Sequence, residues 1–265
     1  NDQLLINLVT SNEGNEHFDI QAFADFIQAL HPGRIAGLWH TINDNVADRA
    51  KIENGHSTLI FGQAVIEEEL AGLRFQISME SFFQTNPACA ELLYDKALDY
   101  LFEDPFEPGD IAMDLFCGTG TIGQLMAKRN SAVRIIGVDI VEKAIDDARQ
   151  NAAKNGIHSV EFFAADVGKF LKEYPDFQGK IKRIMLDPPR AGIAPKTLQK
   201  VIALEADSIV YISCNPSTQA RDAATLIDAG YVLEKYALVD QFPHTGHQYL
   251  MRFLTSEKLI FLEIT

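Results

Sequence analysis

The chain has 265 residues, of which 47% are hydrophobic and 23% charged, a balance typical of a globular protein with one large or two modest domains. Its formal net charge of -14 disfavours nonspecific binding to nucleic acid by this chain alone, and it contains no apolar run long enough to predict a membrane span. The cysteines Cys89, Cys117 and Cys214 form no CxxC pair. This argues against a zinc or iron–sulfur site and for a reducing compartment, so we expect a cytoplasmic protein without a bound metal.

Residues 1–80 are expected to form a small α+β domain. Apolar runs predict strands over Leu4–Val9 and Arg34–Ile42. Between them, apolar residues at helical spacing predict a helix over Phe18–Leu30. Three short runs between residues 57 and 78, separated by glycine turns, then predict a small antiparallel meander.

Residues 81–265 are expected to form an α/β domain. After a predicted helix over Cys89–Phe102, strands alternate with helices. The strands are predicted at Ile111–Phe116, Arg134–Asp139, Ser159–Ala164, Arg183–Asp187 and Ser208–Ser213. This alternation predicts a parallel sheet with right-handed crossovers. Two consecutive strands at the end, Tyr231–Val239 and Gln248–Leu254, predict an antiparallel hairpin that completes the sheet.

Cys214 lies directly after the last of the alternating strands and just before a helix that Pro216 begins. Ligands bind at this edge of open α/β sheets. The partial positive charge at a helix N-terminus is expected to lower the pKa of the thiol and to favour the thiolate. The simpler alternative is a small buried cysteine with no chemical role, and the remaining motifs bear on the choice.

A glycine-rich turn, Asp114-Leu-Phe-Cys-Gly-Thr-Gly120, follows the first of the alternating strands, and Gly123 completes a G-x-G-x-x-G pattern. Asp139 ends the next strand, where a carboxylate can hold ribose hydroxyls. The pattern alone also fits a dinucleotide-dependent oxidoreductase. Asp114 favours a cationic amino group instead, since it would repel a pyrophosphate. For Asp139 and Asp166 the simpler alternative is helix capping.

Two further segments suit the recognition of a planar ring. Asp187-Pro-Pro-Arg190 follows the fourth strand, so Asp187 is expected at the same sheet edge as Cys214, on a turn that two prolines stiffen. Such a turn could hold a ring that has an N–H to donate, or it could be a proline-rich loop with a capping acid. In Ser81-Phe-Phe-Gln-Thr-Asn86, adjacent aromatic rings and two amides either pack internally or clamp a flipped base.

These segments occur together with Ser213-Cys-Asn-Pro216, Ala220-Arg-Asp222 and Phe242-Pro-His-Thr-Gly-His247. In this order, from about Leu73 to about Met251, they resemble the RNA 5-methyluridine (uracil-C5) methyltransferases. The resemblance implies an α/β, Rossmann-like class I methyltransferase sheet, preceded by a small α+β central domain. It also implies S-adenosylmethionine as the methyl donor and ribosomal or transfer RNA as the substrate, with ribosomal RNA favoured.

The resemblance also implies roles for individual residues. Cys214 would add to C6 of the uracil, so that C5 becomes enolate-like and takes the methyl group. Asp187 and His247 are the other two expected catalytic residues. The expected cofactor site comprises Gln84, Asp114, Phe116, Gly118, Gly120, Asp139, Asp166 and Asp187, with Phe83 nearby. The expected uridine site comprises Phe82, Gln84, Asn86, Asp187, Arg190 and Arg221.

One departure from the family concerns the base that removes the C5 proton. The family usually has a glutamate two residues after the second histidine of Phe242–His247, whereas this chain has Tyr249. A tyrosine pKa of about 10 makes a poor base near neutral pH. Two interpretations therefore stay open. One is an active methyltransferase in which His247 or water takes the proton. The other is a degenerate member that binds cofactor and RNA and traps the Cys214 adduct.

Two other classes of enzyme explain less of the sequence. A nicotinamide-dependent oxidoreductase gives Asp187-Pro-Pro-Arg190 and Cys214 no role. A methyltransferase acting on nitrogen needs no nucleophilic cysteine. The chain begins with Asn1 rather than Met, and the family's N-terminal RNA-binding barrel has no counterpart in it. We therefore expect a monomeric piece of a longer protein, from which an RNA-binding module is missing.

Overall fold

The computed structural model describes residues 3–13, 17–44, 56–79, 81–177, 179–244 and 249–256. The chain divides into two compact units, the first formed by residues 1–69 and 74–83 and the second by residues 70–73 and 84–265. We propose that these units correspond to the two expected domains, 1–80 and 81–265. Among the described residues, no helix has the length and apolar character that crossing a membrane requires.

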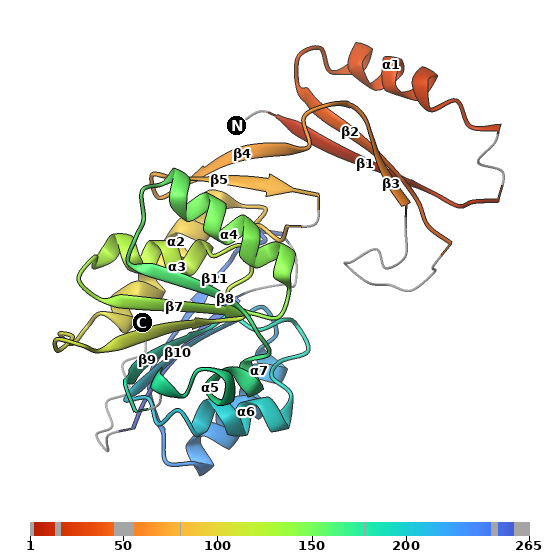
Figure 1. The fold of residues 1–265 in the computed structure, drawn as a ribbon. Helices are drawn as coiled ribbons and strands as arrows, with labels where there is room; N and C mark the ends of the chain where they lie inside the picture. The colour runs from red at the N-terminus through yellow and green to blue at the C-terminus, as the bar shows by residue number, and fades with distance from the viewer. Residues whose placement is uncertain are drawn as a thin grey trace. The chain divides into compact units, whose positions relative to one another are not determined.

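The first unit is built around a β–α–β arrangement. In chain order its first elements are β1 (Leu4–Thr10), α1 (Ile20–Leu30), β2 (Ile35–Ile42) and β3 (His56–Gly62). Strands β1 and β2 are parallel, and β3 pairs antiparallel with β2 (Figure 1). Asp19 begins α1 by accepting a hydrogen bond from the backbone N–H of Ala22. Ala24 and Ile27 of the helix pack with Leu38 in a small core.

The meander predicted between residues 57 and 78 is wrong in part. β4 (Val65–Leu70) and β5 (Leu73–Ser78) form a separate two-stranded sheet, whereas β3 belongs to the sheet of β1 and β2. Ala71 and Gly72 make the two-residue turn with φ values of 48° and 71°, the left-handed conformation that tight hairpins need. The apolar pattern predicts that a segment is a strand but leaves the partner strand open.

The second unit confirms the predicted α/β fold. Its helices are α2 (Pro87–Leu101), α3 (Thr121–Arg129), α4 (Glu142–Lys154), α5 (Val167–Glu173), the short 3-10 helix Pro175–Phe177, α6 (Pro195–Ile202) and α7 (Pro216–Asp228). Its strands are β6 (Ile111–Leu115), β7 (Arg134–Asp139), β8 (Val160–Ala164), β9 (Ile181–Leu186), β10 (Ser208–Ser213), β11 (Val232–Val239) and β12 (Tyr249–Thr255).

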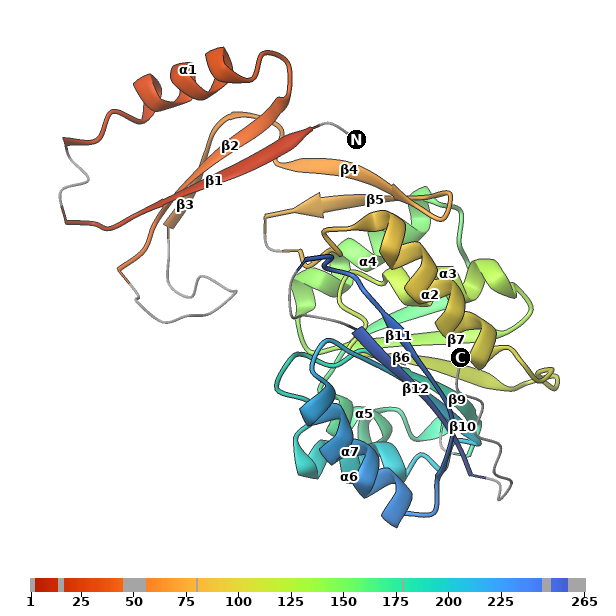
Figure 2. The same ribbon diagram turned by 180° about the vertical axis from the view of Figure 1, so that it is seen from behind.

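These strands form one sheet in the order β11-β12-β10-β9-β6-β7-β8. Neighbours from β10 to β8 are parallel, and β12 runs antiparallel to both β10 and β11, as the predicted C-terminal hairpin requires. Helices α2, α3 and α4 cover one face and α5, α6 and α7 the other (Figures 1 and 2). Because both faces are covered, the middle of β10, Ile209–Ile212, is a continuous and fully buried apolar run.

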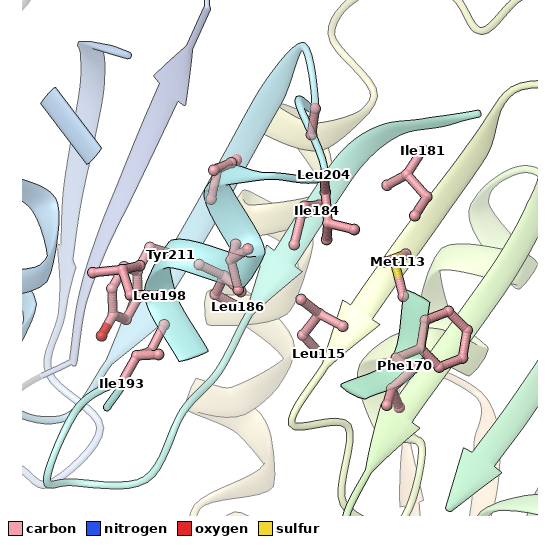
Figure 3. Close-up of a cluster of buried hydrophobic side chains, with 14 of the residues drawn as sticks. Met113, Leu115, Phe170, Ile181, Ile184, Leu186, Ile193, Leu198, Leu204 and Tyr211 are labelled. Carbon is pink, nitrogen blue, oxygen red and sulfur yellow. The ribbon is translucent and has the colours of Figure 1, made fainter. Parts of the chain in front are cut away.

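The core between the sheet and α5–α7 sets the positions of the strand ends. Leu115 of β6, Leu186 of β9 and Tyr211 of β10 are all fully buried in one cluster (Figure 3). They also pair in register, Leu115 with Leu186 and Leu186 with Tyr211. The carboxyl ends of β6, β9 and β10 therefore lie side by side, and the segments that follow them share one edge of the sheet.

Candidate active site

Residues from three adjacent strands meet at this edge. Asp114 is the penultimate residue of β6, Asp187 follows β9, and Cys214 follows β10. The backbone N–H of Asp187 donates to the carbonyl of Leu115 across a distance of 3.4 Å, which extends the pairing of β6 and β9 to the end of the strand. The sheet thus brings together Asp114, Asp187 and Cys214.

The glycine turn after β6 uses its glycines for different purposes. Gly118 has a φ of 52°, and a Cβ there would meet no atom within 4 Å, so a ligand can approach the backbone closely. Gly120 has a φ of 74°, but a Cβ there would lie 2.5 Å from the ring of Phe162, so this glycine permits close packing of the helix. Phe116 has a φ of 65°, a strained value for a non-glycine residue and one that recurs at functional sites.

Asp114 is a buried carboxylate with an unused oxygen. Its Oδ2 accepts a hydrogen bond of 2.7 Å from the backbone N–H of Gly123, in the first turn of α3. Its Oδ1 is buried and has no hydrogen-bond partner among the described residues. Burial raises the pKa of Asp114 well above its ordinary value, and the negative charges of Asp187 and Asp139 add to this effect. An unsatisfied buried carboxylate oxygen suits a cationic or N–H donor from a ligand.

Asp139 and Asp166 occupy strand ends with different local roles. Asp139 accepts hydrogen bonds from the backbone N–H groups of Gly118 (3.0 Å) and Val141 (2.9 Å), so it ties the glycine turn to the start of α4. Asp166 is the N-cap residue of α5, yet its side chain makes no capping hydrogen bond. The simple capping interpretation therefore explains Asp139 in part and does not explain the side chain of Asp166.

This set of groups fits S-adenosylmethionine. The unused oxygen of Asp114 matches a cationic amino group, the open backbone at Gly118 admits close contact, and the partly exposed carboxylate of Asp139 can accept from ribose hydroxyls. Ile140 follows Asp139 and is 68% exposed, which offers an apolar surface to a planar ring. Sequence reasoning missed Ile140, although an apolar residue directly after a strand-end acid was visible.

The loop that carries Asp187 is tied to the segment that carries Cys214. The backbone carbonyl of Arg190 accepts hydrogen bonds from the Asn215 side chain (3.0 Å) and from the Thr218 hydroxyl (3.2 Å). Asn215 also caps α7 by accepting from the backbone N–H of Ser217. Asn215 therefore both holds the loop that carries Asp187 and caps the N-terminus of α7.

A buried acid braces the same loop from the other side. Asp222 of α7 is 1% exposed, and its Oδ2 accepts from the Ile193 backbone N–H and the Tyr211 hydroxyl, both at 2.8 Å. Arg221 pairs with Asp222 and donates to the backbone carbonyls of Ala191 and Ile193. Arg221 thus supports the loop, and its expected contact with a substrate stays a prediction.

The expected low pKa of the Cys214 thiol is wrong for the protein as the structure shows it. Burial raises its pKa, and the negative charge of Asp187 raises it further, whereas the Arg190 guanidinium acts in the opposite direction. The helix end has less influence than expected because Cys214 precedes the N-cap Asn215. Burial also raises the pKa of Asp187, to about 7, although this residue keeps a little exposed surface. Asp187 therefore changes charge near neutral pH.

Gln84 and Tyr249 add a hydrogen-bonded pair to the site. The Gln84 Nε2 donates to the Tyr249 hydroxyl at 3.1 Å, and the two residues are 4% and 5% exposed. Burial, together with the charges of Asp187 and Cys214, raises the pKa of Tyr249 to about 12. Tyr94 of α2, which sequence reasoning missed, also belongs here, since the Gln84 side chain and the charge of Asp187 both act on its hydroxyl. No local pattern distinguishes Tyr94 from an ordinary core residue.

Of four other expected residues, the structure describes three. Asn86 uses its amide within the protein, capping α2 through the Cys89 N–H and donating to the Gln241 carbonyl. Phe82 has a ring that is 70% exposed and belongs to the first compact unit, so its stacking on a base stays a prediction. Phe83, in the same unit, packs against Phe75 with ring centroids 5.7 Å apart. His247 lies outside the described residues.

Cys117 shows no sign of nucleophilic activation. Cys117 is buried, and burial together with the charges of Asp114 and Asp139 raises its pKa well above the ordinary value. Cys89 lies in the first turn of α2. In the part of the chain that the structure describes, no cluster of histidine, cysteine and acidic side chains is arranged to hold a metal ion.

Comparison with protein families gives a match over residues 42–256 to the family described as tRNA (Uracil-5-)-methyltransferase. An uncharacterized RNA methyltransferase of Clostridium tetani is 39% identical over 246 residues, which cover 92% of this chain and 51% of that protein. The 23S rRNA (uracil(1939)-C(5))-methyltransferase RlmD of Haemophilus influenzae is 39% identical over 188 residues, covering 71% of this chain and 42% of RlmD. The chain thus spans about half the length of the curated relatives that it matches.

A solved structure is similar over nearly the whole chain. The tRNA (uracil-54, C5)-methyltransferase of Pyrococcus abyssi, in complex with S-adenosyl-L-homocysteine, superposes with a TM-score of 0.69 at 28% identity. The similarity covers 96% of this chain and 56% of the Pyrococcus chain.

Proposed function

Because the chain belongs to the tRNA (uracil-5-)-methyltransferase family, we propose that it transfers a methyl group from S-adenosylmethionine to C5 of a uridine in RNA. One observation carries the proposal. Cys214, Asp187 and the Gln84–Tyr249 pair converge at one sheet edge, next to a glycine turn over a buried acid with an unused oxygen. This arrangement provides a nucleophile, a titrating acid and amide recognition beside a site that suits the methyl donor.

In the proposed reaction the sulfur of Cys214 forms a bond to C6 of the uracil, and the electrons of the C5–C6 double bond move toward the C4 carbonyl. S-adenosylmethionine supplies the electrophilic methyl group that C5 then takes. Removal of the C5 proton restores the double bond and expels the Cys214 thiolate. The adduct thus activates a carbon that is otherwise a poor nucleophile.

Asp187 suits the proton transfer that begins this sequence. The Cys214 thiol must lose its proton before it attacks, and its raised pKa means that little thiolate exists in the free protein. Asp187 has a pKa of about 7 and acts electrostatically on Cys214, so its carboxylate is matched to accept that proton near neutral pH. The neutral acid then donates a hydrogen bond to the uracil carbonyl, on which negative charge develops.

Tyr249 favours a second candidate function. With a pKa of about 12, its phenol stays protonated at neutral pH and does not remove the C5 proton. If no other group takes that proton, the chain forms the Cys214 adduct and releases product slowly. It then acts as a trap for RNA rather than as a fast enzyme. The two candidates share every step up to methyl transfer.

For the RNA, we favour ribosomal over transfer RNA as the substrate. RlmD of Haemophilus influenzae, a 23S rRNA enzyme by its name, is 39% identical, whereas the Pyrococcus tRNA enzyme is 28% identical. The net charge of -14 makes tight binding of RNA by this chain alone unfavourable. The proposal therefore assigns catalysis to this chain and leaves part of the RNA affinity to other contacts.

The test incubates the chain with a 23S rRNA transcript and S-adenosylmethionine labelled in the methyl group. Label in free RNA, as 5-methyluridine, supports the active enzyme. Label that stays with denatured protein supports the trap. Both signals should disappear in Cys214→Ala and persist in the control Cys89→Ala. Turnover by Cys214→Ala would contradict the covalent mechanism, and absence of any label with both ribosomal and transfer RNA would contradict the function.

A further inference from the structure

Strand β12 places the side chain of Tyr249 in contact with Gln84, the residue proposed to recognise the base. Tyr249 is the first residue of β12, and the next residue, Leu250, pairs with Ser213, which immediately precedes Cys214. The Tyr249 hydroxyl accepts a hydrogen bond from Gln84 Nε2, which is 165 residues away in the sequence. The chain thus links its proposed nucleophile and its proposed recognition amide through one buried phenol.

Only one of the two polar atoms of the Gln84 amide has a hydrogen-bond partner among the described residues. Its nitrogen donates to Tyr249, while its Oε1 is buried and has no hydrogen-bond partner among the described residues. A buried acceptor without a donor destabilises the folded state, so its retention calls for an explanation such as a ligand. A free amide oxygen requires an N–H or O–H from that ligand. Uracil carries an N–H at position 3, whereas cytosine has a lone pair there.

A second buried phenol belongs to the environment of Gln84. The Gln84 side chain lowers the pKa of Tyr94 in α2, against the larger effect of burial, which raises it. Burial raises the pKa of both phenols, and the negative charge of Asp187 raises it further, so both hydroxyl groups stay protonated near neutral pH.

We propose that Tyr249 is a positioning residue that holds the Gln84 amide with Oε1 directed to the N–H of the target uracil, and so sets the preference for uracil over cytosine. This inference rests on the proposed function and adds a determinant of base specificity to it. It predicts that Tyr249 acts through Gln84 and not through the cofactor.

The experiment uses 23S rRNA transcripts made with 5-fluorouridine or, separately, with 5-fluorocytidine. A fluorine at C5 cannot leave as a proton does, so the adduct persists, and its rate of formation reports base recognition without the release step. In the presence of S-adenosylmethionine, the parent chain is expected to form the denaturation-resistant adduct faster with 5-fluorouridine. Tyr249→Phe should lower that rate at least tenfold. It should also reduce the ratio between the rates of adduct formation with 5-fluorouridine and with 5-fluorocytidine. Tyr249→Glu keeps an acceptor for Nε2 and should stay within about threefold of the parent.

A double-mutant comparison separates positioning from a general structural effect. In a Gln84→Met background, Tyr249→Phe should lower the rate no further, because the group through which it acts is gone. Affinity for S-adenosylhomocysteine should be the same in Tyr249→Phe and the parent. An unchanged rate in Tyr249→Phe, an equal loss in both backgrounds, or a parallel loss of S-adenosylhomocysteine affinity would each overturn the positioning role. A parent chain that forms no adduct would instead overturn the proposed function, and this inference with it.

Discussion

Asp187→Asn tests whether the acid at the centre of the site is as strongly desolvated as the structure indicates. Burial raises the pKa of Asp187 from the ordinary 3.8 to about 7. The folded protein therefore binds this proton more tightly than the unfolded chain does. Below about pH 4 both states hold the proton and folding carries no penalty. As the pH rises from about 4 to about 7 the unfolded chain ionises first, so the free energy of unfolding falls.

The size of this penalty follows from the shift. Each pKa unit is worth about 1.4 kcal/mol, so a shift of about three units makes the ionised folded state less stable by about 4 kcal/mol above pH 7. This is an upper bound, because Asp187 keeps some exposed surface. Asparagine has no charge to desolvate. Asp187→Asn should therefore be more stable than the parent at pH 8 by up to about 4 kcal/mol and similar to it at pH 4, while methyl transfer is lost.

The assay is urea unfolding of the parent and the variant at half-unit steps between pH 4 and pH 8. The quantity of interest is the difference between the two proteins at each pH, since other acids also change the stability of both. Asp228→Asn, at an exposed position at the end of α7, is the control and should give a small difference throughout. A difference between Asp187→Asn and the parent that stays flat from pH 5 to pH 8 would refute the desolvation argument, and with it the proposed proton transfer from Cys214.

Three further predictions concern release, bracing and the cofactor. Tyr249→Glu places a carboxylate near the target carbon, so free 5-methyluridine should form faster and the amount of protein-bound label should fall. An unchanged ratio of free to protein-bound label would show that another step limits release. Asp222→Ala leaves the Ile193 N–H and the Tyr211 hydroxyl without their acceptor, so urea unfolding should show a loss of about 2–4 kcal/mol, and a loss under 1 kcal/mol would contradict the bracing role. Gly118→Val fills the open space at the glycine turn and strains its backbone, so calorimetry should show S-adenosylhomocysteine affinity reduced at least tenfold, and unchanged affinity would move the cofactor elsewhere.

The sheet edge could be predicted from the sequence because parallel strands with covered faces leave a strong signal. Each strand is an apolar run in the sequence. The residue at the end of the strand or shortly after it can therefore be identified from the sequence alone, as with Asp139, Asp187 and Cys214. The shared edge then follows from the βαβ rule without any knowledge of side-chain packing. The order of the strands within the sheet, and hence which acids are neighbours, does not follow from the pattern.

The electrostatics of the site could not be predicted in the same way. A helix start after Cys214 suggests a lowered thiol pKa, but the sign depends on how deeply the sulfur is buried and on the neighbouring Asp187. Both depend on the pairing of β9 with β10. The Gln84–Tyr249 hydrogen bond joins the segment before α2 to the last strand, so no local spacing reveals it. Partners that are distant in sequence are set by the fold, and their effects appear only with it.

The buried acids also explain why several hydrogen bonds hold the loop after Asp187 in place. Asp114 lies near the end of β6, and Asp187 follows the neighbouring strand β9. Both lose hydration, and the charge of Asp187 raises the pKa of Asp114. Two such acids favour any movement that exposes them to water. Asp222 and Asn215 oppose that movement, since one holds the Ile193 end of the loop and the other holds the Arg190 carbonyl. The bracing residues are therefore needed because the site is electrostatically unfavourable, and a variant that neutralises Asp187 should tolerate the loss of Asp222 better than the parent does.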